Sequence, residues 1–270
     1  MSDALSVCRT AYPIEAVRWT TSLIAKLPEC TRSNSMRPAD MAWERNGARF
    51  RTSTGAVISL PSAYTAGARE MYCRNVYLRT GLTMPTSGWV IDLGANHGLF
   101  SVWAAVTGAQ VIAVEAQQGF APLIQTLAEH NGVGERVFVE TAMAGGITIS
   151  GATVGVVADD SRWAATSHGA PTRPMEVSMP MLISKYGIDA IGLLKLDIEG
   201  GEFAVLAAEE DLSWLAQVKQ IVLELHRDHG DVKALIDSLL NRGFDVELRD
   251  NRGERVNICD SHLAYAYGRR

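Results

Sequence analysis

Apolar residues recur with two different periods along this chain, and the change of period divides it near residue 85. Before that point the pattern predicts a helix, a β-hairpin and a second helix. The first helix begins near Pro13 and is ended by Pro28 and the polar stretch 31–35, and two short strands flank Thr54-Gly55 within 49–60. The apolar residues of 63–82 predict the second helix. The residues at helical spacing in the first helix are Ile14, Val17, Ile24 and Leu27.

From residue 88 onward, short apolar runs alternate with segments of helical periodicity, a pattern typical of a parallel sheet covered by helices on both faces. The stretch 232–240 is a clear amphipathic helix that ends at Asn241-Arg242-Gly243. Buried strands are predicted at 90–93, 110–115, 136–139, 191–198 and 220–225.

The last two predicted strands, 244–248 and 263–267, have no helix-length segment between them, so 250–262 predicts an antiparallel return. The whole pattern predicts an α/β class, with a doubly wound, mostly parallel sheet of seven strands and an antiparallel edge, over 86–270. Residues 1–85 are expected to be a helical and hairpin extension that caps the site or mediates dimerisation. The Gly- and Ser/Thr-rich segment 144–175 is not assigned.

Composition narrows the classes of function. The chain has 270 residues, 47% of them hydrophobic and 20% charged, which is ordinary for a globular protein with a substantial core. A net charge of −5 argues against the broad basic surface that nucleic-acid binding needs. No secretory signal and no run of 18 apolar residues is visible, so a membrane partner is not expected. Four scattered cysteines without a CxxC pair favour a reducing, cytoplasmic setting.

The first candidate site is the loop Asp92-Leu93-Gly94-Ala95-Asn96-His97-Gly98, which follows a strand and opens a helix. Ligands of open α/β sheets bind at such turns. Glu115 ends the next strand, where a carboxylate can accept both hydroxyls of an adenosine ribose. The alternative is a structural βα turn without a ligand. His97 lies within the loop and is expected to shape the pocket.

The glycine spacing decides between two kinds of cofactor. It is G-x-x-x-G, and Asn96 stands where a dinucleotide fold needs its second glycine for the pyrophosphate. Asp92 would repel a phosphate and would suit a cationic amino group. An adenosine that carries an amino acid is S-adenosylmethionine, which is therefore the predicted cofactor. A nicotinamide-dependent oxidoreductase on the same sheet is the alternative.

A second cluster of charges, Leu194-Lys195-Leu196-Asp197-Ile198-Glu199-Gly200-Gly201-Glu202, crosses the end of the fourth predicted strand. Strand alternation would place Lys195, Asp197 and Glu199 on one side if the chain is extended. Buried charges are costly unless they pair, so the cluster either meets the methionine moiety, an acceptor or a metal, or fastens the strand end through a Lys–carboxylate pair. Glu202 is expected on the following helix.

Histidine adds a candidate base. His226 ends the fifth predicted strand and could act as a general base with a pKa near the operating pH, or could be a hydrogen-bonded structural residue. His229 is three residues away on a turn, which does not predict a zinc site. His168, in the unassigned segment, could line the acceptor side.

The motifs VIDLGANHGLFS, VIAVEA, LLKLDIEGGEFAVL and IVLELH, in this order, resemble the FkbM family of S-adenosylmethionine-dependent methyltransferases. The similarity covers about residues 70–248, and the K-x-D-x-E-G-x-E segment is its most specific part. The resemblance implies a Rossmann-like, seven-strand methyltransferase fold and methyl transfer, usually to oxygen, in natural-product, sugar or glycolipid pathways. It does not imply which acceptor is used.

The resemblance also implies site residues. The loop residues Asp92, Gly94, Asn96 and Gly98 would line the methionine end of the cofactor. Glu115 would bind the ribose, and Ala142 would lie near the adenine. The remaining residues expected in the cofactor site are Ala95, Phe100, Ala116 and Asp197.

These residues predict direct in-line transfer of the sulfonium methyl group, for which the protein aligns the acceptor and weakens its O–H bond. Asp197, Glu199 and His226, with Lys195, are expected around a small-molecule acceptor. A divalent ion held by the carboxylates is another way to lower a hydroxyl pKa, although no residue is assigned to a metal. A non-catalytic, cofactor-binding partner subunit and a homodimer are further hypotheses.

Overall fold

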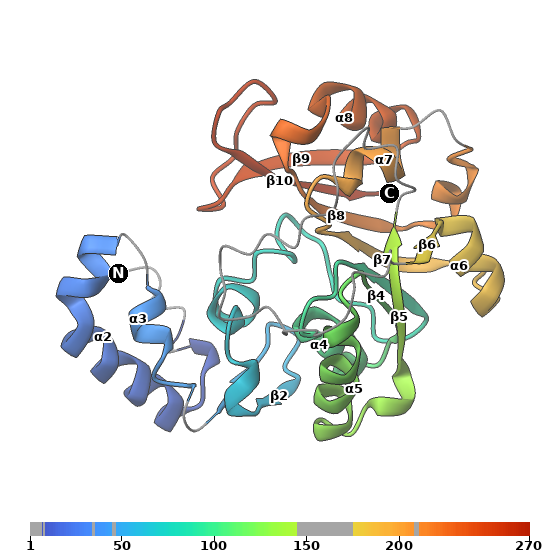
Figure 1. The fold of residues 1–270 in the computed structure, drawn as a ribbon. Helices are drawn as coiled ribbons and strands as arrows, with labels where there is room; N and C mark the ends of the chain where they lie inside the picture. Colours follow the sequence, from blue (N-terminus) through green and yellow to red (C-terminus); the bar gives the residue numbers. More distant parts are fainter. Residues whose placement is uncertain (1–6, 8, 34–35, 45–46, 145–174, 208–210) are drawn as a thin grey trace.

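The computed structural model describes residues 7, 9–33, 36–44, 47–144, 175–207 and 211–270, and its centre is an eight-stranded sheet (Figure 1). The strand order is β6-β5-β4-β3-β7-β8-β10-β9. All seven predicted strands are present, and the short β6 is an eighth that pairs with β5. The strands are β3 (Trp89–Leu93), β4 (Gln110–Glu115), β5 (Val137–Ala144), β6 (Met175–Val177), β7 (Ile191–Leu196), β8 (Gln220–Glu224), β9 (Asp245–Asp250) and β10 (Leu263–Arg269).

Strands β3 to β8 are parallel, whereas β10 lies antiparallel between β8 and β9, as the sequence predicts. The chain order reverses beside β3, because β4, β5 and β6 extend the sheet on one side and β7 and β8 on the other. This is the switch point at which doubly wound sheets bind ligands, outside the carboxyl ends of the strands. The β3–β7 register places Asp92 beside Lys195.

Helices cover both faces of the sheet, and strand alternation divides the interior into two cores. Val90 packs into the core under α4 and α5, whereas Ile91 and Leu93 face the core under α6, α7 and α8 (Figure 1). The helices are α4 (Leu99–Thr107), α5 (Ala121–His130), α6 (Met179–Tyr186), α7 (Gly201–Ala207) and α8 (Val232–Asn241). Short 3-10 turns are η3 (Gln118–Phe120), η4 (Gly134–Arg136), η5 (Ser213–Gln217) and η6 (Arg227–His229). No described helix is long and apolar enough to cross a bilayer.

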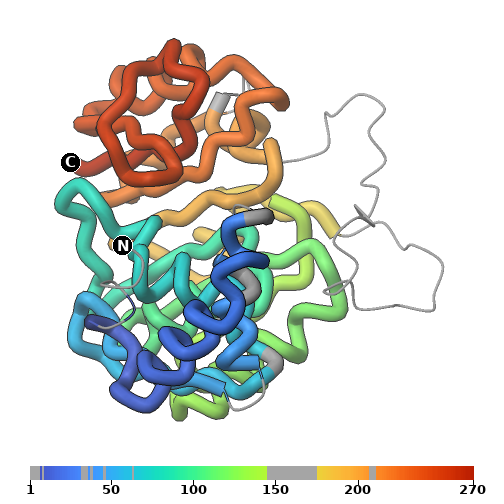
Figure 2. The backbone as a smooth tube through the Cα atoms, turned by 90° about the vertical axis from the view of Figure 1, so that its left-hand side faces the viewer, coloured from blue at the N-terminus to red at the C-terminus, as the bar shows by residue number. Residues whose placement is uncertain are grey.

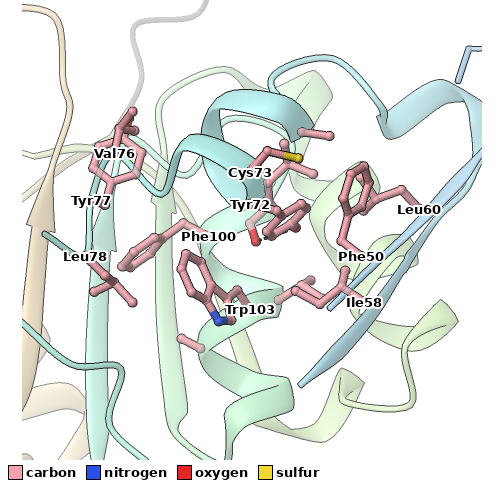
Figure 3. Close-up of a cluster of buried hydrophobic side chains, with 14 of the residues drawn as sticks. Phe50, Ile58, Leu60, Tyr72, Cys73, Val76, Tyr77, Leu78, Phe100 and Trp103 are labelled. Atoms are coloured by element: carbon pink, nitrogen blue, oxygen red, sulfur yellow. Dashed lines mark hydrogen bonds between the residues drawn. The ribbon is translucent and has the colours of Figure 1, made fainter. Parts of the chain in front are cut away.

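The N-terminal residues add a helical and hairpin layer on the α4 side (Figure 2). Helix α2 (Pro13–Ser33) packs on the short α3 (Arg37–Asp40), and β1 (Ala48–Arg51) pairs antiparallel with β2 (Val57–Leu60), as predicted. The hairpin contacts α4 through β2. A continuous series of aromatic contacts joins this layer to the sheet: Trp19, Trp43, Phe50, Tyr72, Trp103, Phe100, Tyr77 and Tyr265. Figure 3 shows its middle part, from Phe50 to Tyr77.

Helix α2 continues through Pro28 and ends at Ser33, within the polar stretch 31–35 that the sequence predicts at its end. A proline removes one helical hydrogen bond, yet Cys30 beyond it is buried in the core, and the Thr31 hydroxyl donates to the Leu27 carbonyl. Packing beyond the proline therefore keeps the chain helical.

The prediction of one helix over 63–82 is wrong, because none of these residues belongs to an α-helix. This stretch forms a 3-10 turn, η1 (Ser62–Tyr64), and one π-helical segment, η2 (Arg69–Arg74). Asn75 and Thr80 adopt left-handed backbone angles, with φ of 51° and 58°, which end any regular helix. The apolar side chains of the segment are buried in several directions instead of along one helical face.

Candidate active site

The turn between β3 and α4 is pressed against the end of β7. Gly94 has a φ of +79°, and a Cβ atom placed on it would lie 1.7 Å from the carbonyl oxygen of Asp197. The N–H groups of Gly94 and Ala95 both donate to the Val114 carbonyl at the end of β4. Only glycine fits this conformation and this close approach, so the first glycine of the motif joins three strand ends.

Glu115 is fixed on the same turn. One carboxylate oxygen accepts the N–H of Asn96 and the other accepts that of Gln117, each at 2.8 Å. Asn96 itself is exposed in a left-handed conformation, with a φ of 50°. Burial raises the pKa of Glu115, and the two N–H groups offset part of this shift. A carboxylate oxygen can accept more than one hydrogen bond, so both oxygens retain capacity for a ligand hydroxyl.

Asp92 does not face a ligand as expected, because its carboxylate is fully buried and bonded within the protein. One oxygen lies 2.9 Å from the Lys195 Nζ, and the other accepts the Ser101 hydroxyl at 2.6 Å. Lys195 also donates to the Gly94 carbonyl at 3.1 Å. Burial alone would lower the pKa of Lys195, but Asp92 and Asp197 outweigh it and raise the pKa. The Lys–carboxylate pair thus fastens β3 to β7 beneath the glycine turn.

The other residues expected to bind the cofactor occupy different environments. Phe100 is 1% exposed and packs edge-to-face on Tyr77 and Trp103, so its side chain belongs to the core and not to a ligand surface. Gly98 starts α4 with a φ of +83°, against Ile124. Ala116 is half-buried directly after β4, and Ala95 is buried within the turn.

Ala142 lies near the end of β5, beside a mostly apolar hollow of about 610 Å³. The hollow is bounded by β5, β6 and α6, including Val177, Pro180 and Met181. It does not include the charged residues at the ends of β7 and β8. The expected contact of Ala142 with adenine stays a prediction.

Asp197 directly follows β7, and its partner was not foreseen from the sequence. The Tyr77 hydroxyl donates to Asp197 Oδ2 at 2.7 Å and lies 3.4 Å from Glu224 Oε2. Glu224 ends β8, and burial together with the nearby Asp197 raises its pKa to about 7. Tyr77 and Asp197 are 120 positions apart in the chain, so local sequence pattern carries no signal for this contact.

Glu199 and His226 meet between the ends of β7 and β8. Strand β7 stops at Leu196, and Glu199 has a φ of 53°, so the predicted alternation of Lys195, Asp197 and Glu199 along one extended strand is wrong. The Glu199 side chain is 87% exposed, and its Oε2 lies 3.2 Å from His226 Nε2. The other ring nitrogen, Nδ1, contacts Oε1 of Glu202, which is fully buried on α7.

This contact set corrects the prediction that His226 titrates near the operating pH as a general base. Burial alone would lower its pKa, but hydrogen bonds to Glu199 and Glu202 raise it to about 10. Without a ligand, these two carboxylates favour the protonated imidazole, which is not the form that accepts a proton. Glu202, expected only on the next helix, is a direct partner of His226.

The remaining histidines are separate from this contact set. His97 packs on Phe120 beside the glycine turn, and burial lowers its pKa. His229 lies against Gly200, with its ring centroid 6.4 Å from that of His226. His168, expected on the acceptor side, lies outside the described residues.

Comparison with known proteins identifies the family of this chain. The Methyltransferase FkbM domain matches residues 92–246, which include the ends of the parallel strands β3 to β8. The chain is 30% identical over 210 residues to the 31-O-demethyl-FK506 methyltransferase FkbM of Streptomyces tacrolimicus, covering 66% of this chain and 80% of that protein.

Two further similarities are more limited. The chain is 29% identical over 232 residues to the AMB antimetabolite synthetase AmbE of Pseudomonas aeruginosa, covering 68% of this chain but only 11% of that protein. The structure of M. capricolum TrmK with S-adenosylhomocysteine overlaps 69% of this chain and 63% of its own, at 10% identity and a TM-score of 0.39. The domain match covers more than half of the chain, and on this ground the chain belongs to the FkbM family of methyltransferases.

Proposed function

We propose that this methyltransferase uses S-adenosylmethionine to methylate a hydroxyl oxygen of a small molecule. The observation that carries the proposal is the junction of the Gly94 turn with Asp197 and the anchored carboxylate of Glu115. The Gly94 turn, packed directly against the Asp197 backbone, lies beside a carboxylate suited to a ribose. These features fit an adenosine that carries a charged side chain.

The charges at the strand ends also fit a cationic ligand. Lys195 lies 2.9 Å from Asp92 and 3.9 Å from Asp197, so one ammonium group faces the carboxylates of Asp92, Asp197 and Glu224. The Tyr77 hydroxyl lies between those of Asp197 and Glu224. A sulfonium or an amino group would be attracted here, whereas the phosphates of a nicotinamide nucleotide would be repelled.

When bound, S-adenosylmethionine supplies an electrophilic methyl group. Gly94, Asn96 and Glu115 would hold the cofactor, with Asp197 at its methionine end. Asp197 and Glu224 are placed to orient an acceptor hydroxyl and to receive its proton. Tyr77 would hold Asp197 in place through its hydrogen bond.

The N-terminal layer takes part in this site. Tyr77 belongs to residues 1–85, and it is connected to Trp19 on α2 through aromatic contacts. We propose that this layer closes the acceptor side of the site. Homodimer formation stays a separate prediction.

Two relatives support a small-molecule acceptor, and one of them supports oxygen as the methylated atom. The Streptomyces protein is described as a 31-O-demethyl-FK506 methyltransferase, and this chain covers 80% of its length. AmbE is described as an antimetabolite synthetase, and this chain spans about a tenth of it. Both descriptions concern small molecules, and the first specifies oxygen as the methylated atom.

Calorimetric titration of S-adenosylmethionine and S-adenosylhomocysteine, with NAD as the comparison, tests the cofactor. We expect micromolar binding of both adenosyl compounds, no binding of NAD, and loss of binding in Glu115→Ala. The matched control is Glu135→Ala, an exposed glutamate on η4. Binding of NAD instead, or unchanged affinity in Glu115→Ala, would overturn the assignment.

The acceptor is tested with S-adenosylmethionine labelled with ¹³C in its methyl group and a panel of hydroxylated natural products and sugars. A new ¹³C resonance in the O-methyl region identifies transfer to oxygen. A resonance in the N-methyl region would overturn the O-methyl assignment. Cofactor binding without turnover unless a second protein is added would support the non-catalytic partner subunit.

A further inference from the structure

One cluster at the strand ends combines three side chains of the types that bind divalent cations. Asp197, Glu199 and His226 each offer one ligand atom, and these atoms lie within 4.8 Å of one another. They come from the ends of two neighbouring strands, β7 and β8. The Nε2 atom of His226 is 3.2 Å from Oε2 of Glu199, which is the spacing of two adjacent ligands about 2.0–2.2 Å from one ion.

The orientation of His226 provides a second, independent observation. Its Nδ1 atom is held by Glu202, whose side chain has no exposed surface, so Nε2 is directed toward Glu199. Histidines that bind metals nearly always donate their other ring N–H to a carboxylate or carbonyl, which fixes the ring and its tautomer. Glu202 lies outside the cluster and contacts it only through this histidine.

The second carboxylate oxygen of Glu202, Oε2, is buried and has no hydrogen-bond partner among the described residues. A buried carboxylate is costly unless nearby positive charge compensates it. Asp197, Glu199, Glu202 and Glu224 surround one imidazole, while Lys195 lies 2.9 Å from Asp92 and 3.9 Å from Asp197. The group therefore has more negative than positive charge.

We propose that Asp197, Glu199 and His226 bind a divalent cation and that Glu202 positions His226 for it. Three protein ligands leave coordination positions open for water and for an acceptor oxygen. This role rests on the proposed function, because a cation there would lower the pKa of the acceptor hydroxyl and orient its oxygen. One imidazole and two carboxylates favour Mn²⁺ or Zn²⁺ over Ca²⁺.

The test titrates Mn²⁺ and Zn²⁺ into the metal-free full chain without cofactor or acceptor. We expect one equivalent to bind with micromolar affinity, and Ca²⁺ to bind at least tenfold more weakly. Electron spin echo spectra of bound Mn²⁺ should show modulation from a coordinated imidazole nitrogen. This modulation should disappear in His226→Asn.

Variants separate the ligands from the positioning residue. Glu199→Gln and His226→Asn should weaken Mn²⁺ binding at least tenfold. Glu202→Gln should weaken it about 10–100-fold, and the imidazole nitrogen modulation should persist in a reduced or shifted form. His130→Asn is the control, because His130 lies on α5 and contacts Ser59. Glu199 is 87% exposed, so Glu199→Gln stays informative if the buried variants fail to fold.

Two results would overturn the proposal: no cation binds the wild-type chain, or Mn²⁺ binding is unchanged in both Glu199→Gln and His226→Asn. Titration of S-adenosylmethionine in the presence of a chelator keeps the two proposals distinguishable. Cofactor binding without any metal binding would overturn the cation site and leave the proposed cofactor intact. Loss of both would overturn both.

Discussion

The two halves of the charged site differ in how their charges are compensated. In the paired half, Asp92 bonds to both Ser101 and Lys195. All three side chains are buried, with exposures of 0% for Asp92 and 3% for Lys195. In the open half, Asp197 is 24% exposed and Glu199 87% exposed. Lys195 of the paired half and Asp197 and Glu199 of the open half belong to one K-x-D-x-E motif, which begins in β7 and continues past the end of that strand at Leu196. A charge whose partners lie inside the protein supports the architecture, whereas a charge with free capacity at the surface is available to a ligand.

Gly94 is where the two halves touch, so Gly94→Ala should have the largest effect. The Cβ would overlap the Asp197 carbonyl at 1.7 Å, and the φ of +79° adds strain. We expect a loss of about 2–6 kcal/mol in the free energy of unfolding, from about 1–3 kcal/mol of backbone strain and about 1–3 kcal/mol of overpacking. Denaturant titration measures it.

The matched control is Gly55→Ala in the hairpin turn. Gly55 has a similar φ of +82°, but its Cβ would meet nothing within 4 Å. Gly55→Ala should therefore lower the free energy of unfolding only by the cost of backbone strain, about 1–3 kcal/mol. Equal losses in both variants would show that the contact with Asp197 is unimportant.

Lys195→Met tests the paired half directly. It leaves Asp92 buried without its cation, so the free energy of unfolding should fall by about 3–5 kcal/mol. The double variant Asp92→Leu/Lys195→Met should recover most of this loss, because no unpaired charge remains. Lys185→Met is the control, since Lys185 is 58% exposed and pairs with Glu140 at the surface. A loss below 1 kcal/mol in Lys195→Met would contradict a structural role for the pair.

Tyr77→Phe tests the connection between the halves and the N-terminal layer. Removal of the hydroxyl takes one hydrogen bond from Asp197 and should cost about 1–2 kcal/mol of stability. We expect the methyl-transfer rate to fall as well, because Asp197 loses its orientation. Tyr72→Phe loses a hydroxyl bond to the Leu99 carbonyl and serves as the control. A similar stability loss with unchanged rate is expected there, and equal rates in both variants would contradict the role of Tyr77.

The sequence predicted the regular part of the fold because that part depends on short-range pattern. Continuous apolar runs located β3, β4 and β8, and the glycine spacing located the turn that holds Glu115. The contacts between Tyr77 and Asp197 and between His226 and Glu202 depend on tertiary packing across 120 and 24 positions. Periodicity carries no information about such pairs.

Helices α2 and α8 show that sequence periodicity also has a limited power to predict which face of a helix packs. The apolar stripe of α8 is buried as its spacing predicts, with Leu235, Ile236 and Leu239 in the core. The stripe predicted for α2 is exposed: Ile14, Val17, Ile24 and Leu27 are 53–72% accessible. Trp19 on another side of α2 is fully buried instead. Period identifies a helix, but with apolar residues on two faces it does not identify the face that packs.

Glu199→Gln should have the smallest effect on stability and a clear effect on function. Its side chain is 87% exposed, and surface substitutions usually change stability by less than about 0.5 kcal/mol. If the open half exists for ligands, this variant should unfold like the wild type while methyl transfer falls at least tenfold, because one oxygen facing His226 loses its charge. Unfolding and turnover are measured on the same preparations, beside Glu135→Gln as an exposed control. If Glu199→Gln lowered stability as much as Lys195→Met does, the two halves would share one structural role, and the distinction between paired and open charges would not hold.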